Sequence, residues 1–185
     1  MGLSDFAAGE SERRLAPLGR RWAHTRAVAK KARTVATVIA PDDAEMLVAA
    51  AYLHDVGYAP ELTGAGFHPL DGARWLADQG YERLAGLVAH HSGSRHEAAR
   101  RGLDGELRRY PDEDSLVTAA LVYCDLTTGP DGQSMTPDER LADVEARHGA
   151  ESAVALGLRD AWPELLAAVA AVEDRLAVAG IGQPT

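Results

Sequence analysis

The chain has 185 residues, and its 19 Lys and Arg against 28 Asp and Glu give a formal net charge of −9 at pH 7. Hydrophobic residues make up 46% of the chain and charged residues 25%, which is typical of a globular domain. The single cysteine, Cys124, excludes an internal disulfide framework and a cysteine-rich zinc module. The acidic balance disfavours binding to duplex nucleic acid, which requires basic patches.

The hydrophobic residues do not gather into a membrane segment. No apolar run approaches the ~20 residues that a membrane-spanning helix needs. No basic and apolar leader with a small-residue cleavage site precedes the first helical pattern. We therefore expect a soluble, cytoplasmic protein that does not bind membranes.

Apolar residues recur every three or four positions along most of the chain, and this spacing predicts α-helices. After a polar N-terminal stretch, we expect a long helix from about residue 18 to Pro41. A second helix is expected from Asp42, which can cap it, to near Gly57. A third helix is expected from His68 to Gly80, with a proline at its second position.

The second half of the chain shows the same periodicity. We expect a helix over about 84–91, a short helix and a loop within 92–111, and a helix that begins at 114 or 115 and runs through Asp125. Residues 127–132 are predicted to form an ordered loop. Thr136 and Glu139 predict a capping box for a helix that ends near Gly149, and a last helix is expected from about Pro163 to 180.

These patterns predict the fold class. We expect an all-α fold, a single-domain helical bundle over residues 1–185. Its motif-bearing core spans about 18–130, and its C-terminal helices span 136–180.

One histidine is followed directly by an aspartate, at the end of an apolar run. His54 and Asp55 come after the run 48–53, where an aspartate is costly unless a cation neutralises it. A divalent metal with imidazole and carboxylate ligands satisfies this requirement. An ordinary helix end, in which Asp55 caps the next turn, is the alternative. Each of the seven histidines taken alone fits a core or surface residue.

The order of these residues along the chain resembles the HD-domain superfamily of metal-dependent phosphohydrolases. His24 is followed by the His54–Asp55 pair and later by Asp125. The segments 68–73, His-Pro-Leu-Asp-Gly-Ala, and 88–91, Val-Ala-His-His, resemble two further motifs of the members that build a two-metal centre. The resemblance covers about residues 18–130.

The resemblance implies a ligand set for one or two divalent ions, which are Mn, Fe, Co, Ni or Zn. The residues that match the family's ligands are His24, His54, Asp55, His68, His90 and Asp125. It also implies that His54 and Asp55 are catalytic, with Asp55 bridging the two ions. Arg21 and His91 are expected to contact the substrate, and His91 is left open as a further ligand.

Chemically, the resemblance implies hydrolysis of a phosphate monoester or diester, and a nucleotide is the substrate that we expect first. Metal binding lowers the pKa of water from about 15.7 towards about 7, which makes a metal-bound hydroxide the expected nucleophile. The phosphate ester is the expected partner. The general acid and the oligomeric state are left open.

Several residues depart from the family pattern or fit ordinary roles. Tyr58 stands where many relatives carry a lysine, and Arg20 replaces the glutamate of the cyclic-dinucleotide hydrolases, so cyclic dinucleotides are not the first expectation. His96 and His148 are expected on the surface. Arg140 and Arg147, two turns apart, are expected to be solvated and exposed, and closure over the site is the alternative.

Two other functions fit the same residues. Diiron oxygenases of this superfamily use a similar six-ligand set to activate O₂. A non-catalytic domain that binds a metal and a nucleotide is the second alternative. The intact ligand set disfavours the non-catalytic domain, and ligand identity alone does not separate the oxygenase from the hydrolase.

Overall fold

The computed structural model describes residues 2–182 and is all-α within them, as the sequence predicts. Residue 1 and residues 183–185 of the expected domain lie outside the described part. The helices are α1 (Leu3–Leu15), α2 (Arg20–Val35), α3 (Pro41–Leu53), α4 (His68–Asp78), α5 (Glu82–Ala89), α6 (Ser94–Arg101), α7 (Asp104–Leu107), α8 (Leu116–Leu126), α9 (Pro137–His148) and α10 (Ala153–Val178).

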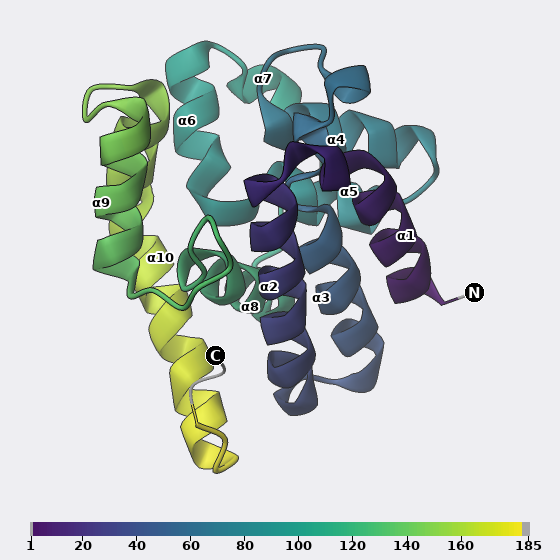
Figure 1. The fold of residues 1–185 in the computed structure, drawn as a ribbon, viewed down its shortest axis with the longest axis vertical. Coiled ribbons are helices and arrows are strands. Elements are labelled where there is room, and N and C mark those ends of the chain that lie inside the picture. Colours follow the sequence, from purple (N-terminus) through teal and green to yellow (C-terminus); the bar gives the residue numbers. More distant parts are fainter. Residues whose placement is uncertain (1, 183–185) are drawn as a thin grey trace.

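The helices pack around one continuous apolar core (Figure 1). Helix α3 contacts α1, α2 and α8, while α4 pairs with α5. Helix α10 runs along the opposite side of the molecule, where it contacts α6, α8 and α9. The division into one domain stays a prediction.

The most deeply buried helices are α3 and α8, and the chemically distinctive residues lie at their ends. Residues 47–55 of α3 and its C-terminus are all buried, and so are residues 120–128 at the end of α8. Such helices read as apolar on every side because other helices surround them. The polar groups at their C-terminal ends are therefore brought into the interior.

The N-terminal stretch, which we expected to be simply polar, is the helix α1. Its buried residues are Ala7, Ser11 and Leu15, which are spaced by four and face α3. Only a few of its residues are apolar, so periodicity alone does not reveal it. Packing against α3, rather than local preference, accounts for this helix.

The last helix begins ten residues earlier than expected, at Ala153 instead of Pro163. Ser152 caps it by accepting a hydrogen bond from the amide of Ala155 at 3.2 Å. Proline lacks the amide that an interior helical position requires, so Pro163 is unusual inside this helix. The first turns of α10 bury Gly157, Leu158 and two alanines. This packing outweighs the hydrogen bond that is lost at Pro163.

Other helix boundaries agree with the sequence or differ by a few residues. Pro41 opens α3, with Ala40 as the N-cap, so Asp42 lies in the first turn and is not the cap. Ser115 caps α8. The capping box of α9 is present, with the amide of Glu139 donating to Thr136 Oγ1 at 3.3 Å.

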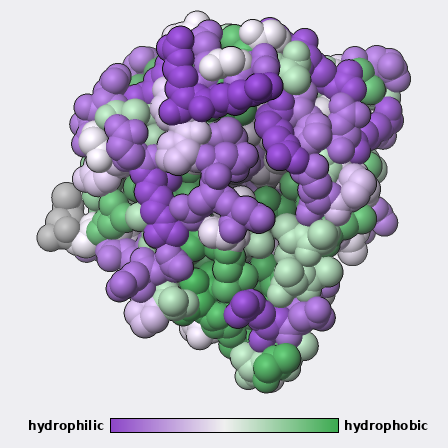
Figure 2. Space-filling view, turned by 180° about the vertical axis from the view of Figure 1, so that it is seen from behind, coloured by the Kyte–Doolittle hydropathy of each residue, from purple (hydrophilic) through white to green (hydrophobic). Residues whose placement is uncertain are grey.

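The apolar face of α10 packs on its own chain, burying Leu165, Val169, Val172 and Leu176. Figure 2 shows hydrophobic residues gathered in the lower part of the face seen from behind, while most of the remainder is hydrophilic. None of the helices between residues 2 and 182 combines the length and the apolar character that a bilayer span requires.

Backbone contact joins the segment after α3 to the first turn of α4. A Cβ built on Gly57 would lie 2.0 Å from the carbonyl oxygen of His68 and 2.6 Å from the amide nitrogen of Gly72. Both are backbone atoms, which cannot rotate away. Only glycine therefore allows the chain after Asp55 to pass this close to His68.

We expect Gly57→Ala to lower the free energy of unfolding by about 3 kcal/mol, because the added methyl group must push two backbone segments apart. The measurement is denaturant unfolding followed by circular dichroism on chelator-treated protein. Gly9→Ala in α1 is the matched control, since nothing lies within 4 Å of the new Cβ, and it should gain about 0.5–1 kcal/mol. Equal stability of Gly57→Ala and the wild type would contradict the contact.

Candidate metal centre

Four side chains from three helices meet in the interior. They are His24 on α2, His54 and Asp55 after α3, and Asp125 near the end of α8. The Nε2 atom of His24 lies 3.0 Å from Asp125 Oδ1 and 3.9 Å from Asp55 Oδ2. The Nε2 atom of His54 lies 3.5 Å from Asp55 Oδ2 and 3.9 Å from Asp125 Oδ1.

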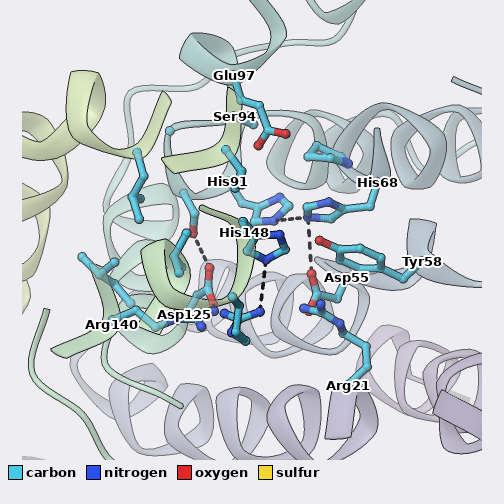
Figure 3. A pocket seen from close by; sticks show the side chains of 18 residues that line it. Arg21, Asp55, Tyr58, His68, His91, Ser94, Glu97, Asp125, Arg140 and His148 are labelled. Carbon is cyan, nitrogen blue, oxygen red and sulfur yellow. Dashed lines mark hydrogen bonds and ion pairs between the residues drawn. The ribbon is translucent and has the colours of Figure 1, made fainter. Parts of the chain in front are cut away.

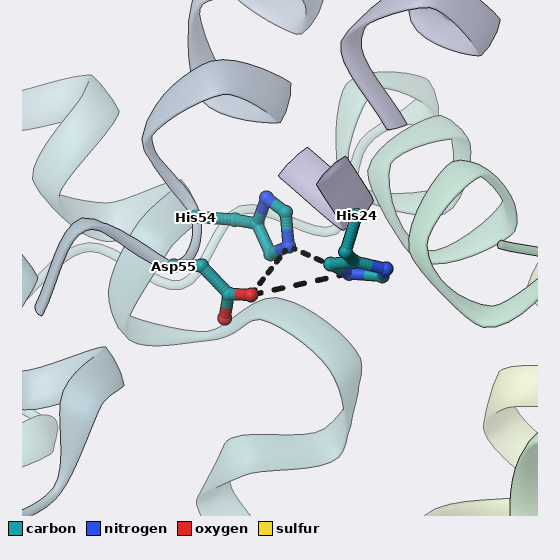
Figure 4. A group of neighbouring side chains, drawn as sticks. All are labelled: His24, His54 and Asp55. Carbon is teal, nitrogen blue, oxygen red and sulfur yellow. Dashed lines mark hydrogen bonds and ion pairs between the residues drawn. The ribbon is translucent and has the colours of Figure 1, made fainter. Parts of the chain in front are cut away.

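The two imidazoles direct their Nε2 atoms towards one another (Figure 4). His24 Nδ1 lies 3.1 Å from the carbonyl oxygen of Gly129, and His54 Nδ1 lies 2.8 Å from that of Ala51. A carbonyl only accepts, so each Nδ1 carries a proton, and each Nε2 is the atom turned towards the carboxylates and the other ring. These Nε2 atoms are 3.4 Å apart, an arrangement that suits a cation shared by the two rings.

Both carboxylates are ionised although they are buried. Burial opposes ionisation of Asp55, but the adjacent Arg21 guanidinium outweighs it and holds the pKa of this carboxyl well below its ordinary value. The guanidinium Nη1 of Arg21 lies 2.7 Å from Asp55 Oδ2. For Asp125, burial is likewise outweighed, by the hydrogen bond with His24, and its pKa is also well below the ordinary range.

This donor set fits a divalent cation. Carboxylate oxygens and two imidazole Nε2 atoms converge in a buried space, and each imidazole is oriented by a backbone carbonyl on its other nitrogen. Such carbonyl-oriented histidines are typical of metal ligands, and mixed imidazole and carboxylate sets suit first-row transition metals. His24, His54 and Asp55 could hold an ion, since their ligand atoms lie within 4.8 Å of one another.

A second group shares Asp55 with the first. Asp55 Oδ1 lies 3.4 Å from His68 Nε2, which lies 3.3 Å from His91 Nε2. These three ligand atoms also lie within 4.8 Å of one another. Because Asp55 turns Oδ2 towards the first group and Oδ1 towards the second, its carboxylate is placed to bridge two ions.

The histidines of the second group are neutral at pH 7. Burial lowers the pKa of His68 well below its ordinary value, against the opposing effect of Asp55. Burial also lowers the pKa of His91, whose Nδ1 donates to the carbonyl of Val88 at 2.6 Å. His91 therefore presents a bare Nε2 to His68.

His90, which the family resemblance indicated as a ligand, lies outside both groups. Its Nε2 is 3.1 Å from the carbonyl oxygen of Tyr110, and its Nδ1 is 3.8 Å from Asp112 Oδ2. His91, and not His90, has its Nε2 atom beside His68. Helix α5 ends at Ala89, and the two adjacent histidines then point to opposite sides of the chain.

A strained residue follows the histidine pair and contacts Asp125. Ser92 has a φ of 49°, the one positive φ of a non-glycine residue in the described part of the chain. Its hydroxyl donates to Asp125 Oδ2. Positive φ costs free energy for a residue with a side chain and marks functional sites, and here it accompanies a contact to a candidate ligand. Sequence reasoning did not identify Ser92.

Lys31 is a second residue that sequence reasoning missed. It is buried, and its Nζ donates to the carbonyl oxygen of Thr127 at 2.7 Å and to Thr127 Oγ1 at 2.8 Å. Burial lowers the pKa of Lys31. The amine anchors the end of α8 just after Asp125, which holds this carboxylate in place. A lysine in an amphipathic helix gives no signal of such a role.

The centre lies at one wall of a cavity that helix α9 covers (Figure 3). Arg140, Val144, Arg147 and His148 of α9 line it. The expectation that Arg140 is exposed is wrong, because its side chain is 11% exposed and its Nη2 lies 3.5 Å from Asp125 Oδ1. The cavity-lining residues of α9 are spaced by about four and seven positions, which places them on one face of a helix. This spacing was the available signal in the sequence, but it does not say towards what that face of α9 is turned.

His148 and Arg147 belong to this cavity, although we expected surface roles for both. Arg147 Nη1 lies 3.2 Å from His148 Nε2. His96 lies away from the centre, with Nε2 3.7 Å from Glu164 Oε2.

Tyr58, which stands where many relatives carry lysine, builds part of the cavity wall. Its ring stacks on His68 with the centroids 4.0 Å apart and the planes at 17°. The guanidinium carbon of Arg21 lies 3.9 Å from the centroid of the Tyr58 ring. Burial raises the pKa of Tyr58 to about 12, so its hydroxyl stays protonated. The tyrosine thus fixes Arg21 on one side and His68 on the other.

We expect His91→Ala to weaken binding of the second ion by at least tenfold, since even an outer partner of a ligand is worth about 10–100-fold in affinity. His90→Ala should change affinity by less than about threefold, because this ring faces away from the centre. The measurement is calorimetric titration with Mn²⁺ together with elemental analysis. His96→Ala is a further control. Loss of an ion in His90→Ala but not in His91→Ala would overturn this arrangement.

Comparison with known proteins agrees with this geometry. The sequence model of the family described as HD domain matches residues 21–178. No curated protein and no solved structure gives a significant match.

Proposed function

We propose that this chain, which belongs to the HD domain family of metal-dependent phosphohydrolases, hydrolyses a phosphate monoester or diester, first of all of a nucleotide. The observation that carries the proposal is the pair of ligand groups that share Asp55 at the wall of an arginine-lined cavity.

The proposed ligands divide into two sets. His24, His54, Asp55 and Asp125 would hold the first ion, and Asp55, His68 and His91 the second. This assigns His91 in place of His90. Bound divalent ions supply an acidified water and neutralise charge on the phosphoryl oxygens. The number of ligands is smaller than two six-coordinate ions require, which leaves positions for water and substrate.

His54 and Asp55 contribute rigidity and charge. His54 is fully buried, and donation from its Nδ1 to Ala51 fixes the ring in one orientation. Asp55 is held by Arg21 through a 2.7 Å ion pair. A group held this firmly loses little entropy on binding an ion, which is the basis of preorganisation.

Arginines around the cavity support an anionic substrate. Arg21, Arg140 and Arg147 line the same cavity as Asp55, although the chain as a whole has a net charge of −9. Guanidinium groups bind phosphate through two parallel hydrogen bonds. Arg21 and Arg140 also contact the candidate carboxylates, whereas Arg147 pairs with Asp143 and is the better probe of substrate binding.

The first test is hydrolysis of a panel of nucleotides and simple phosphate esters by protein loaded with Mn²⁺, Co²⁺, Ni²⁺ or Fe²⁺. We expect turnover of at least one phosphate ester, and a loss of about a thousandfold in Asp55→Asn, because the amide cannot neutralise two cations. Released phosphate and bound metal are measured together. Asp112→Asn is the matched control, since its side chain is 51% exposed.

Two results would contradict the hydrolase. Consumption of O₂ by the iron-loaded protein, with a mixed-valent electron paramagnetic resonance signal, would favour the oxygenase. Stoichiometric metal without turnover of any ester would favour a non-catalytic binding domain.

We expect Arg147→Met to raise KM for the substrate about tenfold with a smaller effect on kcat, because a charged hydrogen bond to the phosphate is lost. Steady-state kinetics measures both constants. Arg159→Met is the control, since Arg159 forms its ion pair with Glu145 on the surface. The same change in both variants would show that Arg147 does not contact the substrate.

A further inference from the structure

A carboxylate of opposite charge lies across the cavity from the arginines. Glu97 of α6 is buried and lines the cavity together with Arg21 and Arg140. Figure 3 shows its carboxyl group directed into the cavity, on the side of His91 and His68 that is away from Arg21. Neither ligand group includes Glu97.

Close packing of α6 against α10 fixes the position of Glu97. A Cβ on Gly157 would lie 2.8 Å from the amide nitrogen of Glu97 and 2.9 Å from its Cα. Before the helix, Gly93 has a φ of 74°, and a Cβ there would lie 2.4 Å from Cβ of Ala161. Two glycines therefore allow the backbones to touch, and Glu97 has little freedom to move away from the cavity.

The surroundings of Glu97 leave part of its carboxylate available. Arg101 Nε donates to Oε1 at 2.7 Å, with the Arg101 side chain 38% exposed and that of Glu97 12%. No bond to Oε2 accompanies it among the hydrogen bonds of the described residues. The ion pair with Arg101 alone adds little to the stability of the protein, since the cost of desolvating the buried Glu97 carboxylate opposes it.

Glu97 also stands where two hollows meet. The cavity beside the candidate metal centre and an adjoining hollow share Tyr58, His68, Glu97, His148 and Val154. The adjoining hollow continues past Phe67 and Gly66. A substrate whose phosphoryl group is at the metal centre, and whose organic part extends into this hollow, passes the Glu97 carboxylate.

We propose that Glu97 determines specificity by accepting hydrogen bonds from hydroxyl groups on the organic part of the substrate, so that the preferred substrates are phosphate esters of ribose or of another polyol. The inference rests on the proposed phosphohydrolase function. A carboxylate is the group that proteins use to bind a ribose diol, because it accepts from two hydroxyls and donates to neither.

The test measures binding, which does not depend on turnover. The probes are the phosphonate analogues of adenosine 5′-monophosphate and of its 2′-deoxy counterpart, in which carbon replaces the ester oxygen, together with inorganic phosphate. Calorimetry with Mn²⁺-loaded protein should give at least about tenfold tighter binding of the ribose analogue. The corresponding analogue of ribose 5-phosphate shows whether a nucleoside or any sugar phosphate supplies the hydroxyls.

Glu97→Gln preserves the shape of the side chain and should abolish the preference, weakening the ribose analogue about tenfold and inorganic phosphate much less. Glu164→Gln is the matched control, because Glu164 is paired with Arg95 on the surface with a side chain 53% exposed. Equal wild-type affinity for the ribose and deoxy analogues, or equal weakening of all probes including phosphate in Glu97→Gln, would overturn the inference.

The outcomes separate the two proposals. Hydrolysis of phosphate esters without any ribose preference would retain the hydrolase and reject the role of Glu97. A Glu97-dependent preference in binding, without turnover of any ester, would retain the role of Glu97 and reject the hydrolase.

Discussion

The buried charge at the ends of α3 and α8 constrains the rest of the molecule. Asp55 and Asp125 are ionised inside a helical core, and the Nε2 atoms of His24 and His54 face them. Leaving such a set without compensation would cost more than the fold gains from a typical interaction. Arg21 and Arg140 supply part of the compensation, and a divalent cation is suited to supply the remainder. The same donors that make the site costly to bury make it able to bind a cation, and a bound cation would in turn bind and polarise an anion.

The fold meets this constraint by contacts that hold each donor residue on the side away from the candidate metal centre. Backbone carbonyls of Ala51 and Val88 hold the rings of His54 and His91, and Lys31 holds the chain after Asp125. The two histidine contacts lie within one turn of chain, whereas Lys31 reaches from α2 to the end of α8 and makes its contact when these two helices pack. The cavity, in contrast, depends on the placement of α9 and α6 against α10. Chemistry and specificity are therefore built from different parts of the chain.

Periodicity and capping predicted the helices whose own sequences carry both an apolar pattern and a capping residue. Examples are α8 with Ser115 at its cap and α9 with its capping box. They missed α1 and the first ten residues of α10, because burial against α3 and α6 decides those segments. Motif order directed attention to His24, His54, Asp55 and Asp125, which the structure brings together. It did not separate His90 from His91, because α5 ends at Ala89, directly before them, and helical spacing then no longer says which way each ring points. Nor did it identify Glu97, whose role in the cavity arises from glycine contacts between distant helices.

The contact of Gly57 with the first turn of α4 links Asp55 and His68 mechanically, since one residue separates Asp55 from Gly57 and the carbonyl that Gly57 meets belongs to His68 itself. An ion held by either group would stiffen the donors of the other. The entropy cost of ordering these donor side chains is then incurred only once for the two binding events. Shared ordering of this kind gives positive cooperativity without a change in shape. Occupancy of the two positions is accordingly expected to rise together over a narrow range of metal concentration.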